Sequence, residues 1–403
     1  MKKFIFTLVS FLLLEFIISI NTGVAQNNWS YLIGPNAGQI RALAQSGSYI
    51  LVSAGSNGVY YYNIIGGGIF THTSLSTSVN VLAVSGNYVF AGTGSGVFVS
   101  ANNGINWSQT SLNDKPITCM TVKGGYVFAG SPFYPTSHGI WISGDNGNTW
   151  TQTNAGISRA LGSNTSYLYN AGMDWGIERS PDNGATWDYT MYGNVFDCIA
   201  TYGSYVYLGN MNGIYRSVNN GNTYTSVFTE DQIYCLYTYS AYVFAGGNYG
   251  VYFSPNGGTT WYPKNQGFPP SGVTITSIVV YPGFDQRILA GDTDGKVWVR
   301  YYPQITEAEN ISNEIPDKFL LYQNYPNPFN PSTDIKFSIS SGGQTKLTVH
   351  DFLGKEISVL VNEYMQPGEY SLNWNADNLP GGVYFYTLSS GKYEETKKML
   401  LLK

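Results

Sequence analysis

Charged residues are scarce in this sequence. They make up 11% of its 403 residues, against about 25% in a typical globular protein. The net charge of −5 arises without acidic or basic blocks, which argues against a nucleic-acid partner. Beyond the N-terminal region no segment is long and apolar enough to cross a bilayer. The mature chain is therefore predicted to bind no nucleic acid and to have no membrane span.

Histidine and cysteine are also rare, with three of each. His72, His138 and His350 fit no catalytic triad and no zinc spacing, and no Cys-x-x-Cys pair occurs. The cysteines are Cys119, Cys198 and Cys235. Each lies seven residues before a tyrosine of the repeat described in the next paragraph, so all three occupy the same position of the repeat, which we expect to be buried and to hold a small residue. We therefore expect buried free thiols, no metal and no cofactor, even in a compartment that permits disulfides.

Aromatic residues and glycine are abundant, with 34 Tyr, 20 Phe and 47 Gly. They recur in a pattern seen clearly in SGNYVFAG (Ser85–Gly92) and KGGYVFAG (Lys123–Gly130). The recurring tyrosines are Tyr49, Tyr88, Tyr126, Tyr167, Tyr205 and Tyr242. Their period of about 40 residues suits four short strands, the size of one propeller blade. Each repeat of the pattern ends in a glycine, and the seven such glycines indicate seven units: Gly55, Gly92, Gly130, Gly172, Gly209, Gly246 and Gly291.

A second motif follows in five of these units. It reads SGDNGNTW at Ser143–Trp150, with copies SANNGINW (Ser100–Trp107), SPDNGATW (Ser180–Trp187), SVNNGNTY (Ser217–Tyr224) and SPNGGTTW (Ser254–Trp261). The motif resembles the Asp-box of sialidase-like and sortilin-like β-propellers. That resemblance implies a propeller fold, in agreement with the repeat length.

The seventh unit supplies only three strands, Thr276–Tyr281, Ile288–Ala290 and Val297–Tyr302. The N-terminal stretch Asn27–Tyr31 is similar to the strand that follows a box, so we expect it to complete the last blade and remove an exposed edge. The predicted fold is all-β: a seven-bladed β-propeller over residues 26–302, closed by the N-terminal strand. A linker, 303–315, and a small Ig-like β-sandwich, 316–403, follow.

Residues 1–25 have the features of a secretory signal peptide. Lys2 and Lys3 precede the apolar segment Phe4–Leu14, and Gly23–Ala25 is a small-residue cleavage site. The alternative is an uncleaved membrane anchor, which Glu15 disfavours because it interrupts the apolar run. We predict an exported protein.

The C-terminal region carries several motifs in order. They are YQNYPNPFNPSTDIKFSI (Tyr322–Ile339), VHDFLGKEISVLVN (Val349–Asn362), PGEYSLNWNADNLPGGVYFYTL (Pro367–Leu388) and the final ETKKMLLLK. They resemble the type A C-terminal sorting domain of the Bacteroidota type IX secretion system. The resemblance implies the secretion machinery as a partner and delivery to the cell surface or medium, and its motif residues include Pro380, Gly382, Tyr384, Lys397 and Lys398. Lys397, Lys398 and the apolar Met399–Leu402 are expected to present a linear signal. The alternative is an ordinary Ig-like binding module.

The boxes have a structural and a ligand-binding interpretation. In the structural interpretation, the Asp or Asn hydrogen-bonds its own turn and the Gly adopts positive φ. In the ligand-binding interpretation, the Asp or Asn binds calcium or a sugar. We favour the structural one, because identical turns around a ring stabilise units rather than build one site. The residues concerned are Asp145, Gly147, Trp150, Asp182, Gly184, Trp187, Asn219, Gly221, Asn256, Gly258 and Trp261.

A ligand site is instead expected at the opposite face. One position begins each inner strand and should ring one mouth of the channel: Arg41, Asn80, Thr118, Arg159, Asp197 and Tyr234. The loops Ser131–His138, Met173–Trp175, Asn248–Tyr249 and Asp292–Asp294 should lie at the same mouth. Arg41, Arg159, Asp197, Tyr234 and Trp175 are the predicted binding residues for a glycan or a protein. The alternative is a set of solvated loop residues over a water-filled channel.

No catalytic residues are predicted. Arg41, Arg159 and a Tyr234–Glu230 pair would supply parts of a sialidase site, but the arginine motif of that family near the start is absent. A glycosidase pair could be drawn from Asp174, Asp197, Asp292 and Asp294 if two of them faced each other across a cleft. The leading hypothesis is thus a recognition or scaffold module, with a glycoside hydrolase as the alternative and a purely structural surface role as a third possibility.

Overall fold

The computed structural model describes residues 28–35, 38–64, 68–133, 137–172, 176–282, 287–301, 309–312, 316–365, 367–377 and 379–403. The predicted signal peptide, residues 1–25, lies outside these ranges. The described chain consists of strands and turns with a single 3-10 element, η1 (Gly55–Asn57), so the all-β class is confirmed. None of the described residues forms a helix that could span a membrane.

The described strands form nine four-stranded sheets, and seven of these lie in the repeat region. Sheet 1 contains β2 (Ile40–Ser46), β3 (Tyr49–Ala54), β4 (Val59–Asn63) and β5 (Thr71–His72). Sheet 2 contains β6 (Val79–Ser85), β7 (Tyr88–Thr93), β8 (Gly96–Ser100) and β9 (Ser108–Gln109). Sheet 3 contains β10 (Cys119–Lys123), β11 (Tyr126–Phe133), β12 (Ser137–Ser143) and β13 (Thr151–Gln152). Sheet 4 contains β14 (Ala160–Ser163), β15 (Leu168–Gly172), β16 (Gly176–Ser180) and β17 (Asp188–Met191).

The remaining repeat sheets follow the same order. Sheet 5 contains β18 (Cys198–Tyr202), β19 (Tyr205–Asn210), β20 (Gly213–Ser217) and β21 (Thr225–Phe228). Sheet 6 contains β22 (Ile233–Tyr239), β23 (Tyr242–Gly247), β24 (Gly250–Ser254) and β25 (Tyr262–Pro263). Sheet 7 contains β26 (Ile275–Tyr281), β27 (Arg287–Asp292), β28 (Lys296–Tyr301) and, from the other end of the region, β1 (Ser30–Pro35).

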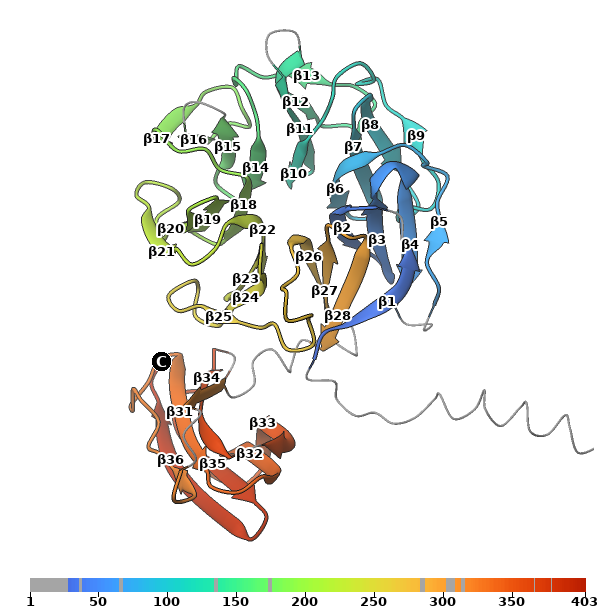
Figure 1. The fold of residues 1–403 in the computed structure, drawn as a ribbon. Helices are drawn as coiled ribbons and strands as arrows, with labels where there is room; N and C mark the ends of the chain where they lie inside the picture. The colour runs from blue at the N-terminus through green and yellow to red at the C-terminus, as the bar shows by residue number, and fades with distance from the viewer. Residues whose placement is uncertain are drawn as a thin grey trace, which may run out of the picture.

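The seven sheets are arranged around a central space with their first strands innermost (Figure 1). Contacts between first strands join neighbouring sheets, namely β2 with β6, β6 with β10, β10 with β14, β14 with β18, β18 with β22, β22 with β26, and β26 with β2. The strands of each sheet are antiparallel, so connections alternate between two faces. We call the face with the first-to-second and third-to-fourth connections the box face, and the other the mouth face.

Strand β1 lies on the outer edge of sheet 7. It pairs with β28 in antiparallel register, Ser30 opposite Val299 and Leu32 opposite Val297, so the predicted pairing of the N-terminal strand with the last repeat is confirmed. The preceding Trp29 is 3% exposed and stacks on Phe268 at 5.1 Å between ring centroids. This burial ties the start of the described chain to the end of the repeat region.

Close packing between neighbouring sheets explains why glycine recurs near the end of the second strand. A Cβ added to Gly92 would lie 2.7 Å from Ile117 Cγ2 of the next sheet, and at Gly291 it would lie 2.4 Å from Ile40 Cγ2. Only glycine leaves room for the isoleucine that enters from the neighbouring sheet. Ile40 belongs to sheet 1 and Gly291 to sheet 7, so the last and first sheets pack in the same way as consecutive ones.

The C-terminal region forms two further sheets with one core. The first contains β29 (Glu309–Ser312), β34 (Gly368–Asn375), β31 (Ser332–Ile339) and β30 (Leu320–Leu321). The second contains β33 (Glu356–Met365), β32 (Gly343–Asp351), β35 (Gly382–Ser390) and β36 (Tyr393–Leu401). Buried side chains from both, such as Phe337 and Tyr386, belong to a single hydrophobic cluster. The predicted linker 303–315 requires correction, because β29 lies within it and pairs with β34.

Candidate functional site

The residues that begin the inner strands lie where the backbone pairing is irregular. In four sheets the register between the first and second strands shifts at this position, leaving the following residues as bulges: Arg41, Asn80, Tyr234 and Thr276. A bulge leaves a residue unpaired and turns its side chain away from the regular pleat. Each bulge lies at the mouth end of its strand. In these four sheets the sequence therefore places one unpaired residue at the mouth face.

Arg159 and Asp197 are brought together across two sheets. Arg159 Nε and Nη2 both donate to Asp197 Oδ1, at 2.8 and 2.5 Å. The Arg159 side chain is 42% exposed and that of Asp197 is 20% exposed. The pair is therefore accessible to solvent and to a ligand, and an ion pair at such a site contributes at most about 1 kcal/mol to stability.

The other predicted mouth residues form separate contacts. Arg41 Nη1 donates to Asn80 Oδ1 at 2.7 Å, and Asn80 Nδ2 donates to the Ile117 carbonyl at 2.9 Å. Tyr234 donates its hydroxyl to Asn248 Oδ1 at 3.0 Å. No described contact links Arg41 or Tyr234 to the Arg159–Asp197 pair, and Trp175 lies outside the described residues.

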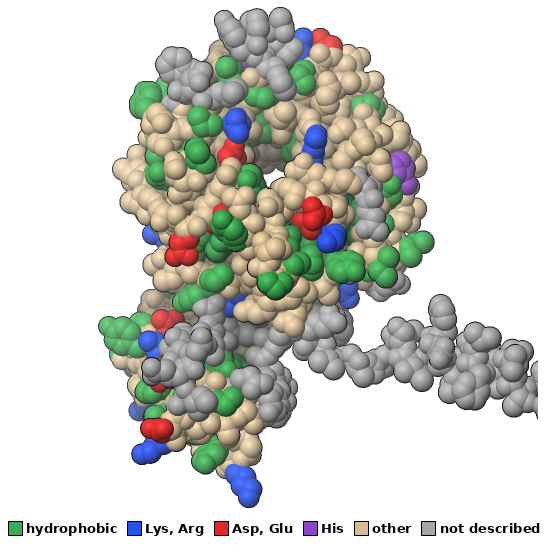
Figure 2. Space-filling model, viewed as in Figure 1, with side chains coloured by type: hydrophobic (Ala, Val, Ile, Leu, Met, Phe, Trp, Pro, Cys, Tyr) green, Lys and Arg blue, Asp and Glu red, His purple; other side chains and the backbone are tan. Residues whose placement is uncertain are grey.

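Exposed apolar side chains accompany the ion pair on the mouth face, and sequence analysis did not select them. Tyr192 is 67% exposed and Val195 43%, in the connection from β17 to β18, while Met211, in the connection from β19 to β20, is 71% exposed. Asn210 Nδ2 donates to the Val195 carbonyl at 3.1 Å, which holds these two connections together. Figure 2 shows hydrophobic and charged side chains around the central opening. A polar pair bordered by accessible apolar groups is suited to binding rather than to packing.

Two of the candidate glycosidase aspartates, Asp292 and Asp197, are held by other groups. Asp292 is 1% exposed; its Oδ1 accepts from the Asp294 and Lys296 amides and its Oδ2 from the Trp298 indole, at 2.8 to 2.9 Å. These bonds hold the turn between β27 and β28. Asp197 is held by Arg159, and Asp174 lies outside the described residues. No cluster of three or more potential metal ligands occurs in the described part of the chain.

The sequence analysis missed two buried carboxyls, Glu178 and Asp231, each 7% exposed, and Glu178 interrupts the repeat pattern. Glu178, on β16, is 7% exposed and accepts from Asn170 Nδ2 at 2.6 Å across the strand pair. Burial raises its pKa above the ordinary carboxyl value, opposed by hydrogen bonds from Asn170 and Tyr189. The other six sheets have an aromatic residue at this place: Tyr60, Phe98, Trp141, Tyr215, Tyr252 and Trp298. Alignment of the third strands would therefore have identified Glu178 from the sequence.

The boxes form closed turns on the box face. Ser143 Oγ donates to Asp145 Oδ1 at 2.8 Å and accepts from the Gly147 amide at 2.8 Å, while the Thr149 amide and hydroxyl donate to the two Asp145 oxygens. The Trp150 indole donates to the Gly147 carbonyl at 3.1 Å. Gly147 has φ of 88°, a conformation that favours glycine. These bonds lower the pKa of Asp145, with Thr149 as the main cause.

The other predicted box residues repeat this arrangement. Asp182 accepts from Ser180 and Thr186, and Asn219 and Asn256 accept in the same way from their own serine and threonine. Gly184, Gly221 and Gly258 have φ of 92°, 80° and 78°. The Trp187 indole repeats the bond to its glycine, whereas the Trp261 indole nitrogen is buried without a partner.

Each box is also held by the sheet before it. Lys123 Nζ donates to Asn183 Oδ1 at 2.8 Å, and Arg216 Nη1 donates to the Gly257 carbonyl at 2.9 Å. Ser111 Oγ donates to the Asn148 carbonyl at 2.8 Å. The described contacts therefore make the boxes joints between sheets, in line with their structural interpretation.

The three cysteines lie on the inner strands β10, β18 and β22, and all three are free thiols, as expected. Cys119 is buried and the other two are half-buried. Burial raises the pKa of Cys119 and of Cys235 to about 12 and also raises that of Cys198. Because the thiolate is the reactive form, the raised pKa values disfavour reactivity at these thiols.

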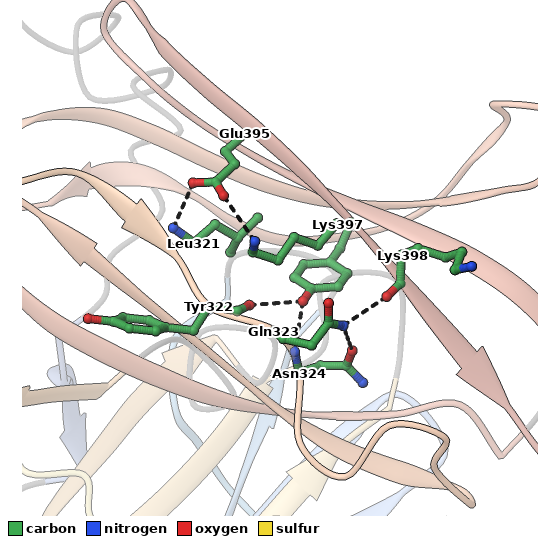
Figure 3. A network of polar contacts seen from close by, with 8 residues as sticks. Leu321, Tyr322, Gln323, Asn324, Glu395, Lys397 and Lys398 are labelled. Carbon is green, nitrogen blue, oxygen red and sulfur yellow. Dashed lines mark hydrogen bonds and ion pairs between the residues drawn. The ribbon is translucent and has the colours of Figure 1, made fainter.

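In the C-terminal module, the segment Leu321–Asn324 is joined to β36 (Figure 3). The Leu321 amide donates to Glu395 Oε2 at 3.0 Å, and Lys397 Nζ lies 3.1 Å from Glu395 Oε1. Gln323 Nε2 donates to the Lys398 carbonyl at 2.8 Å. The two lysines of the predicted signal are thus part of a folded strand.

The apolar tail also differs from expectation. Met399 is 0% and Leu401 is 2% exposed, in the core of the module. The interpretation of Met399–Leu402 as a linear signal is therefore corrected, because alternate residues of a β-strand point into the core. The other predicted sorting residues lie at the start of β35, where Tyr384 donates its hydroxyl to the Pro380 carbonyl at 2.8 Å, with Gly382 between them.

Comparison with known families gives one match. Residues 323–402 match the model of the secretion system C-terminal sorting domain. The chain therefore contains a sorting domain, which indicates export by type IX secretion to the cell surface or the medium. No curated protein gives a significant match to the chain.

Solved structures show similarity in fold. YCF48 from Cyanidioschyzon merolae superposes with a TM-score of 0.53 at 13% identity, covering 68% of this chain and 98% of that one. The extracellular domain of BT4673 from B. thetaiotaomicron gives 0.55 at 14% identity, covering 78% and 45%. Sqt1 from Saccharomyces cerevisiae gives 0.50 at 12% identity, covering 69% and 99%. At these identities the similarity is one of fold: the repeat region is propeller-like.

Proposed function

We propose that the protein is an exported, non-catalytic β-propeller that recognises a ligand at its mouth face. The proposed propeller is an Asp-box propeller over residues 26–302 with seven blades, the seven repeat sheets, closed by β1. The pairing of β1 with β28 and the contact of β26 with β2 support the closure. The hydrogen-bonded box turns support the Asp-box assignment.

Delivery is proposed to follow from the two ends of the chain. Residues 1–25 act as the signal peptide, and residues 323–402 of the C-terminal module carry the match to the sorting domain. The module is proposed to be Ig-like, and Pro380, Gly382, Lys397 and Lys398 to serve sorting through a folded surface. The buried Tyr384 is proposed to support that surface through its hydrogen bond to the Pro380 carbonyl. The protein then acts outside the cell, either released or attached to the surface.

The observation that carries the binding proposal is the accessible Arg159–Asp197 pair on the mouth face. Its guanidinium and carboxylate present donors and acceptors of both charges on the same face as exposed Tyr192 and Met211. Such a combination suits a polar ligand with apolar edges, namely a glycan or a loop of another protein. Arg41, Tyr234 and Trp175 are proposed to extend the same site around the mouth.

A non-catalytic role agrees with the state of the described carboxylates. A glycosidase requires two carboxyl groups about 5 to 9.5 Å apart, facing a cleft. Asp292 instead accepts three hydrogen bonds in its own turn, and Asp197 is paired with Arg159. Both carboxylates thus already serve as acceptors in structural or binding contacts.

The test is a glycan array probed with the purified full-length protein and with an Arg159→Gln, Asp197→Asn double variant. We expect the wild type to bind a restricted set of glycans, and the double variant to lose about tenfold or more in affinity. A Lys355→Gln variant, changed at an exposed loop of the C-terminal module, is the matched control and should bind as wild type. Unchanged binding by the double variant would overturn the mouth site.

A further inference from the structure

Tyr126 differs from its counterparts in the other repeats. It is 41% exposed, whereas the five other recurring tyrosines are half-buried. Several of those are covered by large side chains: Tyr49 packs against Tyr61, Tyr167 against the Arg179 guanidinium, and Tyr242 against Phe253. The equivalent residue of sheet 3 is Ile142, and the Tyr126 ring is accessible.

The box of sheet 3 also makes room for this ring. Gly144 follows the box serine, where the other boxes have Ala101, Pro181, Val218 and Pro255. A Cβ added to Gly144 would lie 2.8 Å from Tyr126 Cε1. The ring thus rests on glycine backbone, in a position that a larger residue at 144 would disturb.

The accessible ring lines a pocket between sheets 3 and 4 on the box face. The pocket has a volume of about 320 Å³ and is open to solvent. The polar residues Gln152, Asn154 and Asp182 line it together with Tyr126. The polar groups are held in place: Gln152 Nε2 donates to the His138 carbonyl at 3.2 Å, and Asn154 Nδ2 donates to the Ala185 carbonyl at 3.2 Å.

We propose that this Tyr126 pocket binds a neutral oligosaccharide. A sugar ring presents a flat apolar face that can stack on the tyrosine, while its hydroxyls can donate to and accept from planar amide and carboxylate groups. Among the described residues that line the pocket there is no arginine, and the neighbouring Lys123 donates to Asn183. The charged residue among them is Asp182, which is negative, so an acidic sugar is disfavoured. The pocket is separate from the proposed mouth site, because it lies on the opposite face.

The experiment is isothermal titration of the full-length protein with four neutral hexasaccharides: cellohexaose, xylohexaose, maltohexaose and chitohexaose. We expect at least one to bind. Tyr126→Ala should weaken that binding about tenfold or more, whereas Tyr126→Phe, which keeps the ring, should stay within about threefold of wild type. Asp182→Asn should weaken it by a smaller factor without disturbing the box, since Asn219 and Asn256 occupy the same place in other boxes.

A matched pair of variants provides the control. Gln152→Ala should weaken binding, whereas Gln109→Ala should not, because Gln109 is the same residue of sheet 2 and its Nε2 makes the same kind of bond, to the Ser95 carbonyl at 3.0 Å. Absence of binding by all four hexasaccharides would overturn the proposal. So would equal binding by wild type, Tyr126→Ala and Gln152→Ala. Loss of binding only in the Arg159→Gln, Asp197→Asn variant would overturn this pocket and support the mouth site instead.

Discussion

The box face and the mouth face of the repeat region use their polar residues in different ways. On the box face, five turns share one set of hydrogen bonds, in which a serine and an Asp or Asn bond within the turn. On the mouth face, equivalent positions hold different residues with different partners: Arg41 with Asn80, Arg159 with Asp197, and Tyr234 with Asn248. Repetition therefore marks what every sheet needs for stability, and variation marks where one ligand can be recognised.

The largest effect is expected from Ser180→Ala on the box face. Ser180 is 0% exposed; its hydroxyl accepts from the Gly184 amide at 2.7 Å and donates to Asp182 at 2.8 Å. Alanine leaves that amide buried without a partner, so the free energy of unfolding should fall by about 1 to 3 kcal/mol. Urea unfolding followed by tryptophan fluorescence measures this. Ser108→Ala, at an exposed serine of β9, is the control and should change stability by less than about 0.5 kcal/mol.

An intermediate effect of opposite sign is expected from Glu178→Gln. Burial raises the pKa of Glu178, so the folded state favours the protonated carboxyl. Its contribution to stability is greatest below the ordinary carboxyl pKa and is lost as pH rises through the folded-state value. Glutamine keeps the acceptor for Asn170 and carries no charge.

The variant should therefore be more stable than wild type by about 1 kcal/mol at neutral pH, with the difference vanishing near pH 4. Thermal unfolding at pH 4 and pH 7 measures both values. A variant that is equally destabilised at the two pH values would show that Glu178 is ionised without cost in the folded protein.

The smallest effect on stability is expected from protonating the box aspartates at acid pH. Hydrogen bonds from Thr186 lower the pKa of Asp182 to about 2, and those from Thr149 lower that of Asp145. A lowered pKa contributes stability above the ordinary carboxyl value, which is lost as pH falls through the folded-state value. The loss should therefore occur between about pH 4 and pH 2.

The Asp145→Asn, Asp182→Asn double variant should lack this loss while keeping the turns, as the asparagines of other boxes do. Its stability relative to wild type should rise as pH falls from 5 to 2, in acid unfolding followed by circular dichroism. A constant difference across that range would mean that the two carboxylates are not held by the folded turns.

The sequence predicted the sheets well because each repeat carries its own signals. The period of the tyrosines and the glycine at the end of each second strand correspond to β3, β7, β11, β15, β19, β23 and β27. The pairing of β1 with β28 was predictable from the resemblance of Asn27–Tyr31 to other outer strands. Regular repeats make such comparisons possible because each unit serves as a reference for the others.

The departures were harder to predict, since they depend on contacts that the repeat pattern does not specify. Tyr126 shares the repeat pattern of the other recurring tyrosines, so the pattern did not indicate its 41% exposure. The burial of Met399 and Leu401 depends on the second sheet of the C-terminal module. β29 was assigned to a linker because its partner β34 lies about 60 residues away along the chain. The pairing of Arg159 with Asp197 at the mouth was not predictable, because it depends on how far the inner strands of two neighbouring sheets are shifted along each other.

The most direct test of the contrast between the faces measures stability and ligand binding on the same variants. The glycan array and urea unfolding are applied to Ser180→Ala and to the Arg159→Gln, Asp197→Asn double variant. We predict that Ser180→Ala lowers the free energy of unfolding by about 1 to 3 kcal/mol and binds mouth-face glycans as wild type. The mouth variant should lose about tenfold or more in affinity and at most about 1 kcal/mol in stability. Loss of binding in a folded Ser180→Ala protein, with binding kept in the mouth variant, would contradict the account.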